Sequence, residues 1–232
     1  MLRICKVNKR YGKKQALIDF SAEFGCGLYG LLGPNGAGKS TFMNILAGVL
    51  KCNSGEIFYN DVNVKELKSK FKETIGYLPQ NVGLYSNFTA EDTLKYFGAL
   101  RNVSKDRIAE RVDYCLEAVN LLENKYDKVG TFSGGMKRRM AIAITLIADP
   151  GILIFDEPTV GLDPKERIRF RELLLELKDS KTIILSSHIV SDIKEAADYV
   201  LMLKEGRLVY ESEVSKTNLE EKYMEIFEEN SL

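Results

Sequence analysis

The stretch GLYGLLGPNGAGKSTFMNIL, residues 27–46, joins a compact apolar run, a glycine-rich loop and a segment with apolar residues at helical spacing. Its middle part fits the pattern GxxxxGK[ST]. Glycines let the backbone wrap closely around phosphate oxygens, and the helix that follows adds the positive end of its dipole. We therefore predict that Lys39 pairs with the β- and γ-phosphates of a nucleotide and that the Ser40 hydroxyl ligates Mg²⁺. The predicted nucleotide contacts come from nine consecutive residues: Gly33, Pro34, Asn35, Gly36, Ala37, Gly38, Lys39, Ser40 and Thr41.

A second apolar run, Ile152 to Phe155, is followed directly by Asp156 and Glu157. In an open parallel sheet, ligands sit at the carboxyl ends of the strands. Asp156 is predicted to hold Mg²⁺ through water, and Glu157, on the opposite side of the strand, to polarise an attacking water. Two carboxylates after an apolar run are a weak signal alone, and their pairing with the phosphate loop 117 positions upstream of Asp156 makes the signal specific.

Apolar strands alternate with helical segments along most of the chain, which predicts an α/β fold with a mostly parallel sheet covered on both faces. Two early runs, residues 2–8 and 16–24, predict a small antiparallel β subdomain. The acidic end of the chain, with seven Glu and two Lys after residue 210, favours a solvated helix. We divide the chain into an α/β core of residues 1–82 and 131–210, an inserted α-helical subdomain of residues 83–130 and an acidic tail of residues 211–232.

The composition excludes several classes of protein. The 232 residues carry 33 Lys and Arg and 33 Asp and Glu, so the formal net charge is zero. Such a balance argues against a nucleic-acid partner, because phosphate contacts normally need a basic surplus. No run approaches the roughly 18 apolar residues of a membrane span, and the first residues lack the apolar segment of a secretory signal.

With the two motifs above, Ser133-Gly134-Gly135 makes the chain resemble the ATP-binding-cassette (ABC) ATPases over roughly residues 2–210. The resemblance implies a P-loop NTPase core that binds ATP and Mg²⁺. It also implies that Tyr11 stacks on adenine and that Gln80 touches Mg²⁺ and faces a transmembrane partner.

Three other motif positions take their roles from this resemblance. Ser133, Gly134 and Gly135 are similar to the family's signature loop, although Phe132 and Met136 replace its commonest Leu and Gln. Asp163 resembles the aspartate of the D-loop. His188, the sole histidine, resembles the switch histidine that donates a hydrogen bond near the γ-phosphate and positions the water.

The resemblance also implies partners. Two cassettes arranged head to tail would place the signature loop of one against the phosphates held by Lys39 of the other, so a second copy of the chain or a paralogous cassette is expected. A separate transmembrane permease subunit would hold the chain at the cytoplasmic face of the membrane. Residues 136–139 and 77–92 look like the branch that serves bacterial drug, antibiotic-peptide and ion exporters.

Other functions stay open at this point. A non-transport ABC ATPase of the DNA-repair, chromosome-organising or translation type would need a long coiled coil or a second cassette, and neither is present in the sequence. A small-molecule kinase would leave Ser133-Gly134-Gly135 and His188 unexplained. A regulatory nucleotide sensor would not need both Glu157 and His188, and measurable ATP hydrolysis would distinguish it.

Overall fold

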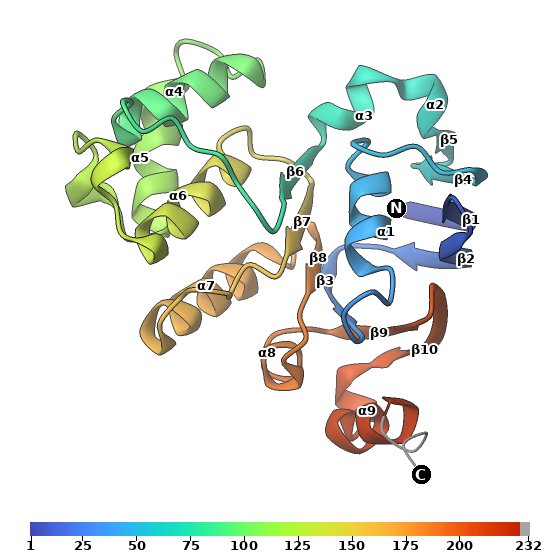
Figure 1. The fold of residues 1–232 in the computed structure, drawn as a ribbon. Coiled ribbons are helices and arrows are strands. Elements are labelled where there is room, and N and C mark those ends of the chain that lie inside the picture. The colour runs from blue at the N-terminus through green and yellow to red at the C-terminus, as the bar shows by residue number, and fades with distance from the viewer. Residues whose placement is uncertain (228–232) are drawn as a thin grey trace.

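Within residues 1–227, which the computed structural model describes, ten strands form two sheets (Figure 1). The strands are β1 Leu2–Tyr11, β2 Lys14–Phe24, β3 Gly27–Leu32, β4 Ser54–Tyr59, β5 Val62–Asn63, β6 Ile75–Leu78, β7 Ile152–Asp156, β8 Thr182–Ser186, β9 Tyr199–Lys204 and β10 Arg207–Glu213.

The larger sheet has the order β10-β9-β3-β8-β7-β6, and every pairing in it is parallel except that of β10 with β9. Every residue of β3, β7 and β8 is buried, as expected for parallel strands covered on both faces. The smaller sheet is antiparallel, in the order β2-β1-β4-β5. The predicted α/β class, with a mostly parallel sheet and a small antiparallel one, is confirmed.

Helices cover the two faces of the larger sheet, and Figure 1 shows α1 on one side of β7 and β8 with α6 and α7 on the other. Alternate residues along β7 point to opposite faces, so Ile154 packs in the cluster with α1 whereas Phe155 packs in the cluster with α6 and α7. The α-helices are α1 Lys39–Leu46, α2 Val64–Leu67, α3 Ser69–Glu73, α4 Ala90–Leu100, α5 Ile108–Ala118, α6 Gly134–Leu146, α7 Pro164–Leu177, α8 Val190–Lys194 and α9 Leu219–Phe227. Three 3₁₀ turns are η1 Leu122–Asn124, η2 Val129–Thr131 and η3 Val214–Lys216.

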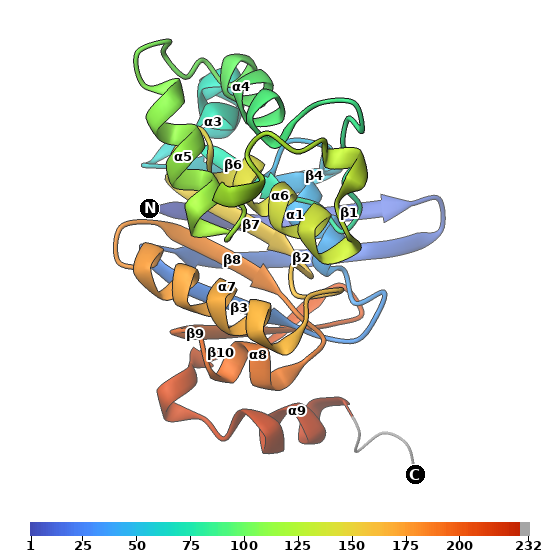
Figure 2. The same cartoon turned by 90° about the vertical axis from the view of Figure 1, so that its left-hand side faces the viewer.

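Helices α4, α5 and α6 pack against one another beside the sheet (Figures 1 and 2). Helix α4 begins after Thr89, whose hydroxyl caps it by accepting the backbone N–H of Asp92 at 3.0 Å. Their facing sides are apolar, with Leu94, Leu116 and Met140 fully buried. Helix α6 follows the predicted 83–130 segment in sequence and completes this helical layer in space.

The acidic tail differs from the prediction of one solvated helix. Residues 207–213 form β10, because Glu205 and Gly206 both have positive φ and close a tight hairpin with β9. The tail helix is shorter, Leu219–Phe227, and it buries Leu219 against the core rather than lying free in solvent. The last residues of the predicted tail, 228–232, lie outside the described residues.

Candidate active site

The phosphate loop begins where β3 ends, and its backbone requires glycine at two positions. Gly33 has φ +152° and Gly38 has φ +111°, in the region that side chains rarely adopt. A Cβ would lie 2.4 Å from the Leu203 carbonyl oxygen at the first position and 2.4 Å from the Ala16 carbonyl oxygen at the second. The loop therefore fits between β9 and β2 only because these residues have no side chain.

The first turn of α1 leaves its N–H groups without a protein side chain. Gly38 is the N-cap and makes no side-chain cap, and no acidic residue occupies the first turn. Lys39 is 6% exposed, and its ammonium donates to the carbonyl oxygens of Gly33 at 2.5 Å and Pro34 at 3.2 Å. Ser40 lies exposed beside it. This combination of free N–H donors and a buried cation suits a phosphate group.

Burial lowers the pKa of Lys39, and the carboxylates of Glu157 and Asp156 act in the opposite direction. The two motifs found 117 positions apart in the sequence are therefore electrostatically coupled in the fold. An anion bound beside the ammonium would compensate the cost of its desolvation.

Asp156 ends β7 and is 2% exposed. Its Oδ1 accepts a hydrogen bond of 2.6 Å from the hydroxyl of Ser186, which ends the neighbouring strand β8. The same Ser186 oxygen accepts the backbone N–H of Glu157 at 2.9 Å. Ser186 thus joins the two acidic positions, which lie at the carboxyl edge of the sheet where the sequence places them.

Glu157 lies one residue beyond the strand, and its φ is +49°. Its direction is set by this left-handed turn and not by the strand alternation that the sequence suggests. Its side chain is mostly buried, and its Oε1 lies 3.2 Å from Nδ1 of His188, a hydrogen bond when that nitrogen carries the proton. The imidazole is half exposed, so the pair sits at the rim of the edge with the ring toward solvent.

Two further predicted residues, Tyr11 and Gln80, are exposed. Tyr11 ends β1 and is 49% exposed, and the Lys9 ammonium lies over one face of its ring, 5.3 Å from the centroid. A flat ligand could stack only on the other face. Gln80 follows β6, the strand next to β7, and its side chain is exposed. Both positions are compatible with the predicted roles.

The signature loop and the D-loop lie together, at the starts of α6 and α7. Ser133 caps α6 by accepting the N–H of Met136 at 3.2 Å, and Asp163 caps α7 by accepting the N–H of Glu166 at 3.0 Å. A Cβ on Gly135 would lie 3.5 Å from the Gly161 carbonyl oxygen. These helices cover the sheet face opposite α1, so the chain itself does not bring the signature loop onto its own phosphate loop (Figure 1).

Sequence reasoning missed two residues of this region. Ser186 ends the run of residues 182–186, and the parallel pairing of that run with the strand ending in Asp156 would have pointed to it. Arg138, on α6, donates to backbone carbonyl groups around Asp156 and Gln80. Nothing in its sequence context indicates those partners.

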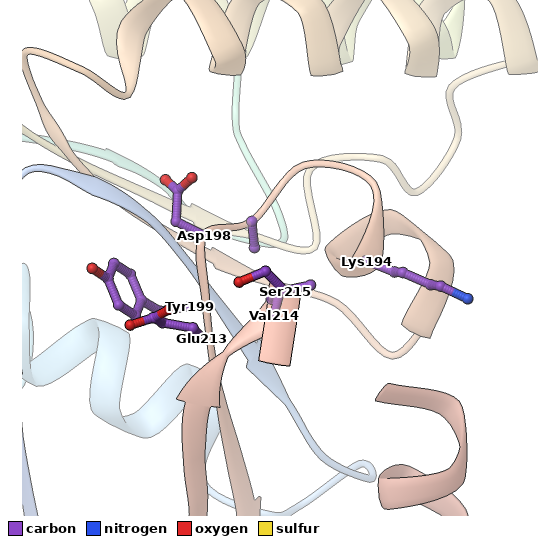
Figure 3. Close-up of a pocket in the computed structure, with 7 residues that line it drawn as sticks. Lys194, Asp198, Tyr199, Glu213, Val214 and Ser215 are labelled. Carbon is purple, nitrogen blue, oxygen red and sulfur yellow. The ribbon is translucent and has the colours of Figure 1, made fainter. Parts of the chain in front are cut away.

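A cavity of about 400 Å³ lies elsewhere, at the amino ends of β9 and β3, and includes Lys194, Asp198 and Tyr199 (Figure 3). The Asp198 carboxylate is already engaged by the Leu28 N–H at 2.9 Å and the Lys178 ammonium at 2.5 Å. The cavity lies at the ends of the strands opposite to the phosphate loop. Its Asp198 carboxylate is used in bonds that stabilise the fold.

Comparison with known proteins agrees with this geometry. A family model described as ABC transporter matches residues 19–160. The linearmycin resistance ATP-binding protein LnrL of Bacillus subtilis is 37% identical over 212 residues, covering 90% of this chain and 68% of that protein. The lantibiotic transport ATP-binding protein SrtF of Streptococcus pyogenes is 38% identical over 224 residues, covering 95% of each chain.

A solved structure is also similar. It is the dimeric post-hydrolysis state of the ATP-binding cassette MJ0796 bound to ADP and Pi, with a TM-score of 0.83 and 25% identity, covering 92% of this chain and 99% of that one.

Proposed function

The chain belongs to the ABC transporter family, and from this premise we propose that it is the ATP-hydrolysing subunit of a transporter whose membrane-spanning part is a separate chain. The observation that carries the proposal is the meeting of Lys39, Asp156, Glu157 and His188 at one edge of the sheet. Among the described residues, no helix is both long and apolar enough to cross a bilayer.

We propose that the phosphate loop, residues 33–41, holds the triphosphate of ATP. The uncapped N–H groups at the start of α1 would donate to phosphate oxygens, and Lys39 would exchange its bonds to the loop carbonyls for bonds to the β- and γ-phosphates. Tyr11, exposed at the end of β1, would stack on adenine.

The residues present also suit Mg²⁺. This ion prefers oxygen ligands and keeps several waters, so the Ser40 hydroxyl, the Gln80 amide oxygen and the Asp156 carboxylate fit it, the last through water. Bound there with ATP, Mg²⁺ would neutralise charge on the β- and γ-phosphates. The hydrogen bond from Ser186 holds the Asp156 carboxylate in one orientation for this role.

We propose that Glu157 polarises the attacking water and that His188 donates to the γ-phosphate and orients that water. The support is their 3.2 Å contact beside the buried Lys39. A carboxylate needs to reach the water through a hydrogen bond. The imidazole can donate from Nδ1 to Glu157 and from Nε2 to the γ-phosphate together only when both of its nitrogens carry protons.

One similar solved structure supports a proposal about how two copies of the cassette assemble. The cassette MJ0796 is dimeric with ADP and Pi bound. We propose that Ser133, Gly134 and Gly135 of one copy complete the phosphate site of a second copy or of a paralogous cassette, with Asp163 beside the interface. The capped start of α6 carries two glycine N–H groups and no acid in its first turn, which suits an anion from a partner.

The relatives also bear on the cargo. LnrL is a linearmycin resistance protein and SrtF a lantibiotic transport protein. We propose that this chain powers export, in the branch that moves drugs or antibiotic peptides, from the cytoplasmic face of the membrane.

We further propose that two parts of the chain have different roles. The α/β core of residues 1–82 and 131–210 binds and hydrolyses ATP, and the helical subdomain of residues 83–130 faces the permease. In that subdomain, the rings of Tyr85, Phe88 and Tyr96 contact one another, and Tyr85 is 51% exposed. An exposed aromatic group of this kind is a suitable contact for another protein chain.

The substitution Glu157→Gln tests the hydrolytic part of the proposal. The amide keeps the shape of the side chain but cannot accept a proton, so turnover should fall at least about a hundredfold while ATP still binds and a closed dimer accumulates. Steady-state hydrolysis and gel filtration with ATP and Mg²⁺ measure both. Glu176→Gln, at an exposed position of α7, is the control and should behave as the wild type.

A pull-down tests the transport part. Tagged Glu157→Gln protein would be captured from detergent-solubilised membranes with ATP and Mg²⁺, and its companions identified by mass spectrometry. A polytopic membrane protein should be recovered, and less of it with Lys39→Ala, which should not close on ATP. Recovery of soluble partners or ribosomes alone would overturn the transporter assignment and leave the ATPase chemistry standing.

A further inference from the structure

Arg138 lies on α6, five residues after the cap Ser133, and its side chain reaches the catalytic edge. Its Nη2 donates to the carbonyl oxygens of Asp156 at 3.0 Å and Glu157 at 2.7 Å, and its Nε donates to that of Pro158 at 3.1 Å. The guanidinium thus contacts three successive peptide groups centred on the proposed catalytic carboxylate.

The remaining nitrogen of Arg138 binds a second segment. Its Nη1 donates to the carbonyl oxygens of Pro79 at 3.1 Å and Gln80 at 3.0 Å, in the loop after β6. A guanidinium has five N–H donors, and all five are matched here by backbone carbonyl groups. Burial lowers the pKa of Arg138, and the nearby carboxylates of Asp156 and Glu157 act in the opposite direction, but its hydrogen bonds all go to backbone carbonyl groups.

The backbone held in this way is strained. Glu157 has φ +49°, a left-handed conformation that costs free energy for any residue with a Cβ. Its N–H is held by the Ser186 hydroxyl and its carbonyl oxygen by Arg138, so both sides of the turn are fixed by other elements. Such a turn persists when its surroundings over-determine it, and Arg138 supplies three of the bonds that do so.

We propose that Arg138 is a positioning residue for ATP hydrolysis: it maintains the left-handed turn that aims the Glu157 carboxylate, and it makes that aim depend on the position of the signature helix α6. The inference rests on the proposed role of Glu157 as the group that polarises water. Arg138 does not touch the nucleotide in this scheme, and it acts through the peptide groups on either side of Glu157.

The neighbouring residue provides a matched control. Arg139 lies on the same helix, is similarly half-buried, and its Nη1 donates to two backbone carbonyl oxygens, those of Val119 at 3.0 Å and Asn120 at 2.7 Å. Those carbonyl groups follow α5 and lie in the helical layer, away from the sheet edge. Arg139→Gln removes two backbone hydrogen bonds and an ion pair of 3.5 Å between Nε and the Glu166 carboxylate, whereas Arg138→Gln removes five backbone hydrogen bonds, and only Arg138 holds the catalytic turn.

The test compares Arg138→Lys, Arg138→Gln and Arg139→Gln in steady-state hydrolysis, ATP titration and thermal unfolding. For Arg138→Gln we expect kcat to fall about 10- to 100-fold with ATP affinity within about threefold of the wild type. Arg138→Lys, which keeps the charge but can contact fewer carbonyl groups, should fall in between and guards against a Gln variant that does not fold. Arg139→Gln should lower the unfolding temperature and keep kcat.

The double variant of Glu157→Gln with Arg138→Lys tests the positioning role of Arg138 separately from the proposed role of Glu157 in hydrolysis. If Arg138 acts through Glu157, adding Arg138→Lys to Glu157→Gln should leave the residual hydrolysis unchanged within about twofold, because the aimed group is already gone. Wild-type hydrolysis by Glu157→Gln would overturn the role of Glu157 itself. If Glu157→Gln is inactive, any one of three results would overturn the positioning role of Arg138 alone. They are a wild-type kcat in both Arg138 variants, a loss of kcat in Arg139→Gln equal to that in Arg138→Gln, and a loss in the double variant that is the product of the two single losses.

Discussion

Helices α1 and α7 begin at the same edge of the larger sheet, after β3 and β7, and their first turns have opposite chemistry. Helix α7 starts with Asp163 as its cap, Pro164 at the first position and Glu166 in the first turn. Helix α1 starts with Gly38, which offers no side chain, and with the buried cation Lys39.

The difference shows how one geometric feature serves two purposes. The first N–H groups of any helix lack partners within the helix. In α7 the chain provides them, since Asp163 accepts the Glu166 N–H at 3.0 Å and two carboxylates complement the dipole. In α1 the chain provides neither a side-chain acceptor nor a negative charge in the first turn, so these N–H groups are available to an anion. Both helices follow a strand of the larger sheet, so their position in the sequence does not distinguish α1 from α7. The residue types in their first turns do distinguish them.

Among the substitutions that test the contrast between α1 and α7, Lys39→Ala is expected to have the largest effect. Removing the buried ammonium takes away the cation that pairs with the phosphates, so ATP affinity should fall at least about a hundredfold, roughly 3 kcal/mol. The unfolding temperature without nucleotide should not fall, because burial without an anion already disfavours the charged lysine and lowers its pKa.

Isothermal titration with ATP and thermal unfolding measure the two quantities. Lys165→Ala, at an exposed position in the first turn of α7, is the control and should keep wild-type affinity. Unchanged ATP affinity in Lys39→Ala would falsify the assignment of residues 33–41 as the phosphate loop.

A smaller effect is expected from giving α1 the chemistry of α7. Thr41 occupies the same place relative to Gly38 as Glu166 does relative to Asp163. Thr41→Glu would place a carboxylate in the same turn as the proposed phosphate site. At an effective dielectric constant of 20, two unit charges about 7 Å apart repel by about 2 kcal/mol, roughly a thirtyfold loss of ATP affinity.

Thr41→Gln is the neutral control for that substitution, because it has the same length. The difference between the two variants should shrink as salt is added, since the charge lies close to solvent. Equal affinities of the Glu and Gln variants at low salt would mean that the start of α1 does not face the phosphates, and the contrast between the helices would lose its electrostatic basis.

Contiguous features of this molecule were predictable from sequence. The phosphate loop is one uninterrupted motif, and its glycines are required by the local backbone conformation. The strands β3, β7 and β8 are apolar throughout because they are buried on both faces. The placement of Lys39 and Asp156 at one edge of the sheet also followed, because parallel strands bring their carboxyl ends to the same edge.

Features that depend on distant partners were not predictable. The left-handed turn at Glu157 is held by Ser186 and Arg138, which come from β8 and α6, and no local pattern specifies it. Helices α2 and α3 were missed because each is only four or five residues long, too short to show a period. The strand β10 was missed because acidic composition outweighed a hairpin whose turn, Glu205-Gly206, needs two positive φ values.

The smallest expected effect concerns the cap of α7, and it is the converse of the Lys39 result. Asp163→Ala removes the acceptor of the Glu166 N–H and should lower the free energy of unfolding by about 1 kcal/mol without nucleotide, whereas Asp163→Asn keeps an acceptor and should cost only a few tenths. Urea unfolding of both variants measures this, with ATP affinity of the monomer expected to stay unchanged. If Asp163→Ala is as stable as the wild type, α7 does not depend on its own cap. In that case the first turns of the two helices differ in sequence but not in how their N–H groups are satisfied.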